Sequence, residues 1–308
     1  MIVCDRLTKF FGKIRAIQDL SLRIPEGQIF GLLGPNGAGK TTTMRMLACL
    51  IKPTYGRANI DGIEIGPENN NLKIRSKIGL LPETPGLYET LGAYKNLDYY
   101  AQLYGVPKNK REENIKKILT NLELWDRRND LAGSFSKGMK QKLAIARALI
   151  HEPKFIFLDE PTASLDPKAA KTVRDYILEL KTKGITILIN THNLGEAEKI
   201  CSQVALIKNH LIKTGNPREL ARGLFARSIR INLDQLPETL PKKILELDFV
   251  TKARIENNQL VLDVKDPEEN NNKIIAWLTQ KSLKVQFVSE EEYSLEDVYL
   301  KLMVEGGE

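Results

Sequence analysis

The spacing of apolar residues divides the chain into short strands and longer helices. Residues 2–7 and 16–24 alternate apolar and polar side chains, which predicts two strands of an antiparallel sheet. Other apolar runs are typical of short buried strands, at residues 28–33, 77–83, 154–160 and 185–190. Helical spacing and breakers predict helices at 41–50, 90–104 and 109–124, in the run ending at 150, and after Asp166. The pattern indicates an α/β protein that is interrupted by an all-helical segment.

The pattern changes near residue 226, and the remainder predicts a second, smaller domain. Strands are expected at 228–233, 251–255, 259–264 and 284–288, with helices at 241–247 and 268–280. Their order, β-α-β-β-α-β, predicts a small ferredoxin-like α+β domain. We therefore expect domains at residues 1–223 and 224–308, with a helical subdomain at about 84–150 in the first.

Turn and capping residues mark the ends of several of these elements. Asn257-Asn258 provides a two-residue hairpin turn, as Asp61-Gly62 does within residues 57–65. Asp266 is expected to cap the helix at 268–280, and Ser294 to cap a last helix at 295–303.

Composition places the chain among soluble folded proteins. Of its 308 residues, 42% are hydrophobic and 28% are charged, and no apolar run approaches the roughly 20 residues that span a bilayer. The N-terminus lacks the apolar core of a signal peptide, so we expect a cytoplasmic protein. Cys4, Cys49 and Cys201 are odd in number and widely spaced, which argues against a disulfide framework or a metal knuckle. The net charge of +7 is spread along the chain among both signs, so charge alone identifies no partner. We expect no nucleic-acid partner.

A glycine-rich segment lies between the apolar strand at 28–33 and a helix. It matches the P-loop pattern G-x-x-x-x-G-K-[ST] and comprises Gly34, Pro35, Asn36, Gly37, Ala38, Gly39, Lys40, Thr41 and Thr42. Glycines let the backbone curl so that its N–H groups point at phosphate oxygens, and the helix N-terminus adds its positive end. Lys40 is expected to reach the β- and γ-phosphates, and the Thr41 hydroxyl to bind Mg²⁺. An ordinary strand-to-helix turn is the alternative, but the flanking strand and helix favour phosphate binding.

Two carboxylates end the strand at 154–160. In a P-loop protein the first, Asp159, is placed to hold Mg²⁺, and the second, Glu160, to orient or deprotonate a water facing the γ-phosphate. Such an acid pair is common at strand ends and becomes informative because a P-loop lies upstream. His192 follows the next strand, at the edge where α/β sheets bind ligands. We therefore expect it to contact the γ-phosphate rather than to be an ordinary surface histidine.

Further candidate ligand groups lie near two helix starts and between the first two strands. Ser136 is a good N-cap, and its hydroxyl with the N–H of Gly138 would form an anion site; a capped helix without a ligand is the simpler alternative. Asp166 caps the next helix, with Pro167 at its first position. Phe11 could stack on an adenine ring or, equally, fill the core at a strand end.

These segments, in this order, resemble the ATP-binding subunit of an ABC transporter over roughly residues 1–223. The resemblance implies that Phe11 stacks on adenine, that residues 34–42 are the Walker A loop, and that Asp159 ends Walker B with Glu160 as the catalytic carboxylate. It makes Ser136, Lys137 and Gly138 part of the signature segment, Asp166 part of the D-loop, and His192 the switch histidine. The implied cofactors are ATP and Mg²⁺. The implied fold is a P-loop NTPase core with an antiparallel β subdomain and a helical subdomain.

Two positions depart from the usual family sequence. Glu83 stands where the family usually has Gln; a carboxylate there can still approach Mg²⁺ or the attacking water, but it adds negative charge near the phosphates. The signature segment reads Phe-Ser-Lys-Gly-Met rather than Leu-Ser-Gly-Gly-Gln, so Lys137 adds a cation while the Ser and the second Gly are retained. Both departures are similar to the drug-resistance-type exporter branch of the family.

The resemblance also implies partners. The P-loop of one subunit would bind Mg-ATP while the Ser136 segment of another closes over the γ-phosphate, in a homodimer or in a heterodimer with a related subunit. A separate membrane permease would dock on the helical segment and the Glu83 turn, which makes this chain a peripheral subunit on the cytoplasmic face of the membrane. We expect an ATPase that powers transport, with export favoured, and a C-terminal domain that supports the dimer or regulates it.

Two other functions are alternatives to transport. A non-transport ABC ATPase acting on DNA or ribosomes would carry a long coiled coil or a second ATPase domain, whereas this chain has one P-loop and only residues 43–134 before the signature. A small-molecule P-loop kinase would not explain the Ser136 motif or the D-loop.

Overall fold

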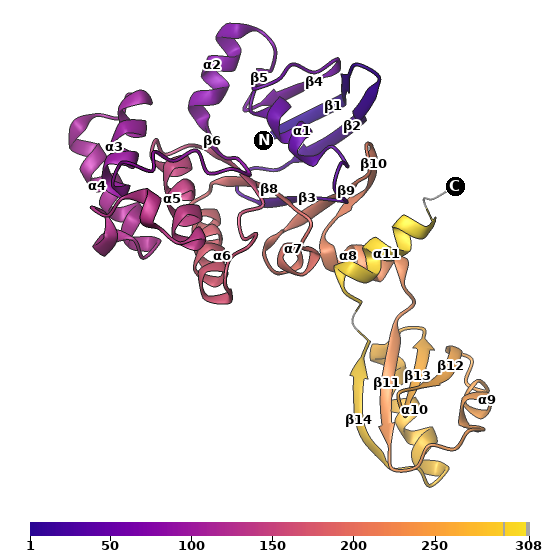
Figure 1. Ribbon diagram of the computed structural model, residues 1–308. Helices are drawn as coiled ribbons and strands as arrows, with labels where there is room; N and C mark the ends of the chain where they lie inside the picture. The colour runs from indigo at the N-terminus through magenta and orange to yellow at the C-terminus, as the bar shows by residue number, and fades with distance from the viewer. Residues whose placement is uncertain (292, 306–308) are drawn as a thin grey trace. The chain divides into compact units, whose positions relative to one another are not determined.

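The computed structural model describes residues 1–291 and 293–305 (Figure 1). It divides into two compact units, Met1–Pro217 and a second that begins at Arg218. The strands of the first unit are β1 (Ile2–Phe11), β2 (Ile14–Ile24), β3 (Ile29–Leu33), β4 (Tyr55–Ile60), β5 (Ile63–Glu64), β6 (Ile78–Leu81), β7 (Phe155–Asp159), β8 (Thr186–Thr191), β9 (Gln203–Ile207) and β10 (Leu211–Gly215). Its helices are α1 (Lys40–Leu47), α2 (Glu68–Lys77), α3 (Ala93–Leu103), α4 (Lys108–Asn121), α5 (Lys137–Leu149), α6 (Pro167–Thr182) and α7 (Leu194–Ile200), with 3-10 turns η1 (Trp125–Arg127) and η2 (Ala132–Ser134).

A six-stranded sheet with the order β10-β9-β3-β8-β7-β6 forms the centre of the first unit. All of its strands run parallel except β10, which pairs antiparallel with β9 at the edge. Every residue of β3, β7 and β8 is buried, as expected for parallel strands that are covered on both faces. Because β8 lies between β3 and β7, the segments that follow these three strands meet at one edge of the sheet.

A second, antiparallel sheet has the order β2-β1-β4-β5. Strands β1 and β2 are longer than the alternation predicts, because register shifts interrupt their pairing and break the period of two without ending the strands. The apolar faces of this sheet, of α1 and of the parallel sheet share one core that includes Ile2, Leu7, Phe30, Met44 and Phe157.

The predicted all-helical segment consists of α3, α4 and α5, which pack against one another, with α5 also lying on β6 (Figure 1). Helices α2 and α7 and strands β9 and β10 of the first unit have no counterpart in the sequence prediction. Helix α2 buries only Ile74, and its one other apolar residue, Leu72, is exposed, so no apolar period reveals it. None of the helices in the described parts of the chain is both long enough and apolar enough to cross a membrane.

The second unit begins within helix α8 (Pro217–Leu224), which the sequence did not predict. Its elements are β11 (Ser228–Leu233), α9 (Leu240–Ile244), β12 (Val250–Glu256), β13 (Gln259–Val264), α10 (Pro267–Gln280), β14 (Val285–Glu290) and α11 (Leu295–Glu305). The four strands form an antiparallel sheet with the order β12-β13-β11-β14. The side chains of Ile231, Leu262, Ile274 and Leu278 belong to a core between this sheet and its helices.

The turn and cap predictions for this unit have different outcomes. Asn257 and Asn258 have φ angles of 48° and 60°, the left-handed backbone of a two-residue hairpin turn, so that prediction is confirmed. Ser294 accepts a hydrogen bond from the Asp297 N–H, as a cap does. The cap predicted at Asp266 is wrong: the residue occupies the N-cap position of α10, but its side chain accepts no cap hydrogen bond. A capping residue needs an extended backbone, whereas Asp266 has a φ of 45°.

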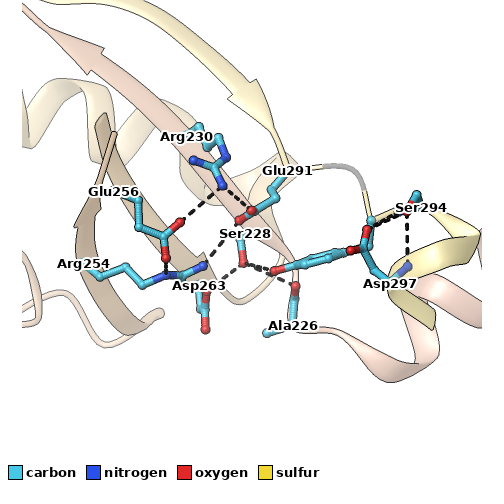
Figure 2. Close-up of polar contacts among 10 residues, drawn as sticks. Ala226, Ser228, Arg230, Arg254, Glu256, Asp263, Glu291, Ser294 and Asp297 are labelled. Carbon is cyan, nitrogen blue, oxygen red and sulfur yellow. Dashed lines mark hydrogen bonds and ion pairs between the residues drawn. The ribbon is translucent and has the colours of Figure 1, made fainter. Parts of the chain in front are cut away.

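Ion pairs cover the opposite face of this sheet (Figure 2). Arg230 on β11 pairs with Glu256 on β12 and with Glu291, and Arg254 pairs with Glu256 and with Asp263 on β13. These contacts link three strands to the segment that leads into α11.

Candidate functional site

A cleft with a volume of about 740 Å³ opens at the edge of the parallel sheet where β3, β7 and β8 end. This is a volume typical of small-molecule sites. The predicted residues that line it are Asn36, Gly37, Ala38, Gly39, Lys40, Thr41, Thr42, Glu83, Lys137, Asp159, Glu160 and His192. Residues that the sequence did not single out also line it, among them Ala16, Gln141 and Asn190. The structure thus brings together segments that lie more than 150 positions apart in the chain.

The P-loop is held in a tight curve by glycine and by neighbouring loops. Gly39 has a φ of 95°, and a Cβ there would lie 2.3 Å from the Ala16 carbonyl oxygen, so only glycine fits. Asn209, in the turn between β9 and β10, donates from Nδ2 to the carbonyl oxygens of Gly37 (3.2 Å) and Ala16 (3.1 Å). These contacts fix the loop that precedes the N-terminus of α1, where unpaired N–H groups favour anions.

Lys40 is the first residue of α1, and its side chain is buried over its own loop. The Nζ donates to the carbonyl oxygens of Gly34 (2.7 Å) and Pro35 (3.0 Å). Burial lowers the pKa of Lys40, while the nearby negative charges of Glu160 and Asp159 oppose that shift. A cation in this position is available to a phosphate group that enters the cleft.

Thr41, Asp159 and Asn190 form a polar cluster beside the P-loop. Asn190 Nδ2 donates to Thr41 Oγ1 at 3.0 Å and also to Asp159 Oδ1. Burial raises the pKa of Asp159; hydrogen bonds from Thr41 and Asn190 oppose this shift, and the negative charges of Glu83 and Glu160 add to it. Asn190 was not predicted as a site residue, because nothing in the sequence distinguishes one polar residue at the end of an apolar strand.

Glu160 follows β7 with a φ of 50°, a left-handed conformation that costs a residue with a side chain about 1–2 kcal/mol. Three contacts hold its carboxylate. Oε2 accepts from Thr191 Oγ1 at 3.1 Å, and Oε1 accepts from the His192 N–H at 3.0 Å and lies 2.7 Å from His192 Nδ1. The carboxylate therefore faces the cleft in a fixed orientation, as a proton acceptor in catalysis must.

The predicted caps of α5 and α6 are confirmed. Ser136 Oγ accepts from the Met139 N–H at 3.2 Å, and Asp166 accepts from the N–H groups of Lys168 and Ala169. Gly138 lies close to α6, where a Cβ would stand 3.2 Å from the Ala169 Cβ. Of the predicted signature and D-loop residues, Lys137 lines the cleft, whereas Ser136, Gly138 and Asp166 are not among the described residues that line it.

Two other predicted residues are exposed. Glu83 lines the cleft from the turn that follows β6. Phe11 is 48% exposed at the end of β1 with the Lys9 ammonium 5.1 Å from its ring centroid, and it is not among the described residues that line the cleft. This exposure excludes the alternative in which Phe11 fills the core.

Comparison with known proteins finds relatives along the whole length of the chain. Residues 17–163 match the family model described as ABC transporter. The chain is 34% identical to the uncharacterized ABC transporter ATP-binding protein YxlF of Bacillus subtilis (strain 168), over 98% of this chain and 99% of that protein. It is 32% identical to the bacitracin transport ATP-binding protein BcrA of Enterococcus faecalis, over 100% of this chain and 97% of that protein.

A solved structure supports the same assignment. The dimeric structure of a post-hydrolysis state of the ATP-binding cassette MJ0796 bound to ADP and Pi matches with a TM-score of 0.65 at 28% identity, covering 70% of this chain and 98% of that one. The resemblance inferred from the sequence and the predicted P-loop α/β core are thereby confirmed. The chain belongs to the family of ABC transporter ATP-binding proteins and is an ATPase of that family.

Proposed function

We propose that this chain binds and hydrolyses ATP to power export through a separate membrane permease. The observation that carries the proposal is one cleft that is lined by the P-loop, three acids and a histidine, the groups that this chemistry requires. The direction of transport rests on Glu83 and Lys137, the two positions that are similar to the drug-resistance-type exporter branch. A relative named for bacitracin transport matches the whole chain and supports a role in transport. A non-transport role on DNA or ribosomes is not favoured, because the full-length relatives above are named as transporter proteins.

The P-loop would bind the phosphates of ATP. Backbone N–H groups of residues 34–42 and the N-terminus of α1 supply donors. The Lys40 ammonium would exchange its contacts to Gly34 and Pro35 for the β- and γ-phosphates, since all are oxygen acceptors at the same loop. The exposed ring of Phe11 is available to stack on adenine.

The residues beside the P-loop fit Mg²⁺. The Thr41 hydroxyl and the Asp159 carboxylate are hard oxygen donors of the kind that Mg²⁺ prefers, and Glu83 adds a second carboxylate at the cleft. A bound Mg²⁺ supplies positive charge that stabilises the phosphates. Glu160 orients a water and accepts its proton, and His192 holds Glu160 in place and contacts the γ-phosphate.

A complete site would form between two subunits. Ser136, Lys137 and Gly138 of one subunit would contact the γ-phosphate bound by the other, with Asp166 near the same interface, in a homodimer or a heterodimer with a related subunit. The permease would dock on the helical subdomain at about 84–150, on the cytoplasmic face of the membrane. Residues 1–223 would form the ATP-binding domain, and residues 224–308 an accessory domain that supports or regulates the dimer.

Affinity purification tests the transport proposal. The tagged chain is recovered from detergent-solubilised membranes, and its Mg-ATP hydrolysis is measured with and without the material that accompanies it. We expect a membrane protein to copurify and to change the rate of hydrolysis. Recovery with ribosomes or DNA, without a membrane protein, would favour the non-transport role.

A further inference from the structure

Asn190 is a buried polar residue between the two strands that carry the P-loop and the acids. It is 2% exposed, and in the sheet it pairs with Leu32 on β3 and with Asp159 on β7. The side-chain amide oxygen of Asn190, Oδ1, is buried and has no hydrogen-bond partner among the described residues. Such an unpartnered acceptor is destabilising, so a residue that only filled space here would be better replaced by an apolar one.

The partners of the amide fix its orientation. An ionised carboxylate only accepts hydrogen bonds, so the side of Asn190 that faces Asp159 must be the NH₂ group. The same nitrogen lies 3.0 Å from Thr41 Oγ1. One amide group therefore joins a hydroxyl on α1 to a carboxylate at the end of β7. A hydroxyl that accepts one hydrogen bond keeps a second lone pair for a cation.

We propose that Asn190 is a positioning residue of the divalent-cation site, which holds the oxygens of Thr41 and Asp159 in place for the ion. The inference rests on the proposed function, in which these two residues bind Mg²⁺. Groups that orient metal ligands are commonly neutral donors of this kind, and their loss reduces metal affinity about 10–100-fold.

The test compares three proteins: wild type, Asn190→Leu and Thr186→Val. Leu has nearly the shape of Asn without its hydrogen-bonding groups. Thr186 is equally buried on β8 but lies at the opposite end of the strand, where it accepts from the Gly27 N–H. The affinity of a fluorescent ATP analogue is measured first in excess EDTA and then as a function of added Mg²⁺, with thermal unfolding of each protein without ligand.

We expect the three proteins to bind the analogue in EDTA with affinities that agree within about two-fold. The Mg²⁺ concentration that gives half of the Mg²⁺-dependent change in affinity should rise about ten-fold in Asn190→Leu only. An unchanged Mg²⁺ requirement in folded Asn190→Leu overturns the inference, as does an equal rise in Thr186→Val. If Asn190→Leu does not fold, Asn190→Ser, which removes the bridge with a smaller side chain, is judged by the same criterion. A wild-type protein that binds no nucleotide under either condition refutes the proposed function instead.

Discussion

Replacing Glu160 with Gln separates the proton-accepting capacity of this carboxylate from its packing. Gln has the same shape and keeps one oxygen, which can still accept from the His192 N–H, while its NH₂ group can donate to Thr191 Oγ1. The fold should therefore lose little: about 1 kcal/mol for weaker hydrogen bonds, or roughly 2–4 °C in the melting temperature.

The catalytic loss should be far larger than the loss of stability. A positioned general base contributes about 10²–10⁴-fold to a rate, which corresponds to about 3–5 kcal/mol of activation free energy. Since a fold weakened by about 1 kcal/mol stays almost wholly folded, a fall in turnover of this size must come from the chemical step. ATP binding should remain, because Lys40 and the P-loop are unchanged.

The assay measures phosphate release at saturating Mg-ATP, nucleotide affinity, and mass by size-exclusion chromatography with light scattering. Glu160→Gln should accumulate an ATP-dependent dimer, since the γ-phosphate stays in place. Thr191→Val is the matched control: it removes the hydrogen bond to Oε2 and leaves the carboxylate, so its turnover should fall about ten-fold or less. Turnover of Glu160→Gln at the wild-type rate would remove Glu160 from the proposed role.

Three further predictions concern Lys40, Ser136 and His151. Lys40→Ala should weaken ATP affinity by about ten-fold or more, because a charge-assisted contact to phosphate is lost; titration with a fluorescent ATP analogue measures it, and wild-type affinity would contradict the proposed contact. Lys40→Ala and Ser136→Ala chains should each be inactive alone, and mixing them should restore roughly a quarter of wild-type hydrolysis. Half of randomly paired dimers contain one chain of each kind, and one of the two sites in such a dimer is intact. A mixture as inactive as its parts would place both groups in one site of one chain. His151 stacks on Tyr104 at 3.8 Å, and burial lowers its pKa to about 4. Between about pH 6.5, the ordinary pKa of histidine, and about pH 4, His151 is protonated in the unfolded state and neutral in the folded state. The free energy of unfolding should therefore fall by about 2 kcal/mol from pH 7.5 to pH 5. His151→Phe should lose less over that interval in thermal unfolding, and an equal loss in both proteins would refute the assignment.

Local chemistry explains which parts of the fold could be predicted from the sequence. The strands at 228–233 and 259–264 were predicted to the residue, because alternating or apolar runs end at clear turn signals such as Asn257-Asn258. Helix α2 was missed because its residues are nearly all polar and its position depends on packing against β6. Asp266 shows the converse: the residue type is right for a cap, but the backbone that the chain adopts there is not.

The site could be predicted where a motif fixes the spacing and not where tertiary contacts alone make a residue important. Lys40, Asp159 and Glu160 each follow from a pattern of neighbours along the chain. Asn190 and Thr191 contact residues on α1 and at the end of β7 that are distant in sequence, and no local pattern marks them. Predicting them requires the register of β8 between β3 and β7, which short apolar runs do not specify.

The position of Ser136 bears on whether one chain is sufficient for catalysis. The cleft of a single chain is lined by the P-loop, the oxygen groups that we propose hold Mg²⁺ and the carboxylate that would accept a proton. Ser136 is not among the described residues that line it, and its hydroxyl caps its own helix. A cap leaves the other N–H groups at the start of α5 free for an anion from another molecule. One chain therefore contains what ATP binding needs, while the Ser136 segment has its N-terminal donors available to a phosphate held by a second copy. This is why we expect the mixed Lys40→Ala and Ser136→Ala dimer to hydrolyse ATP although neither parent does.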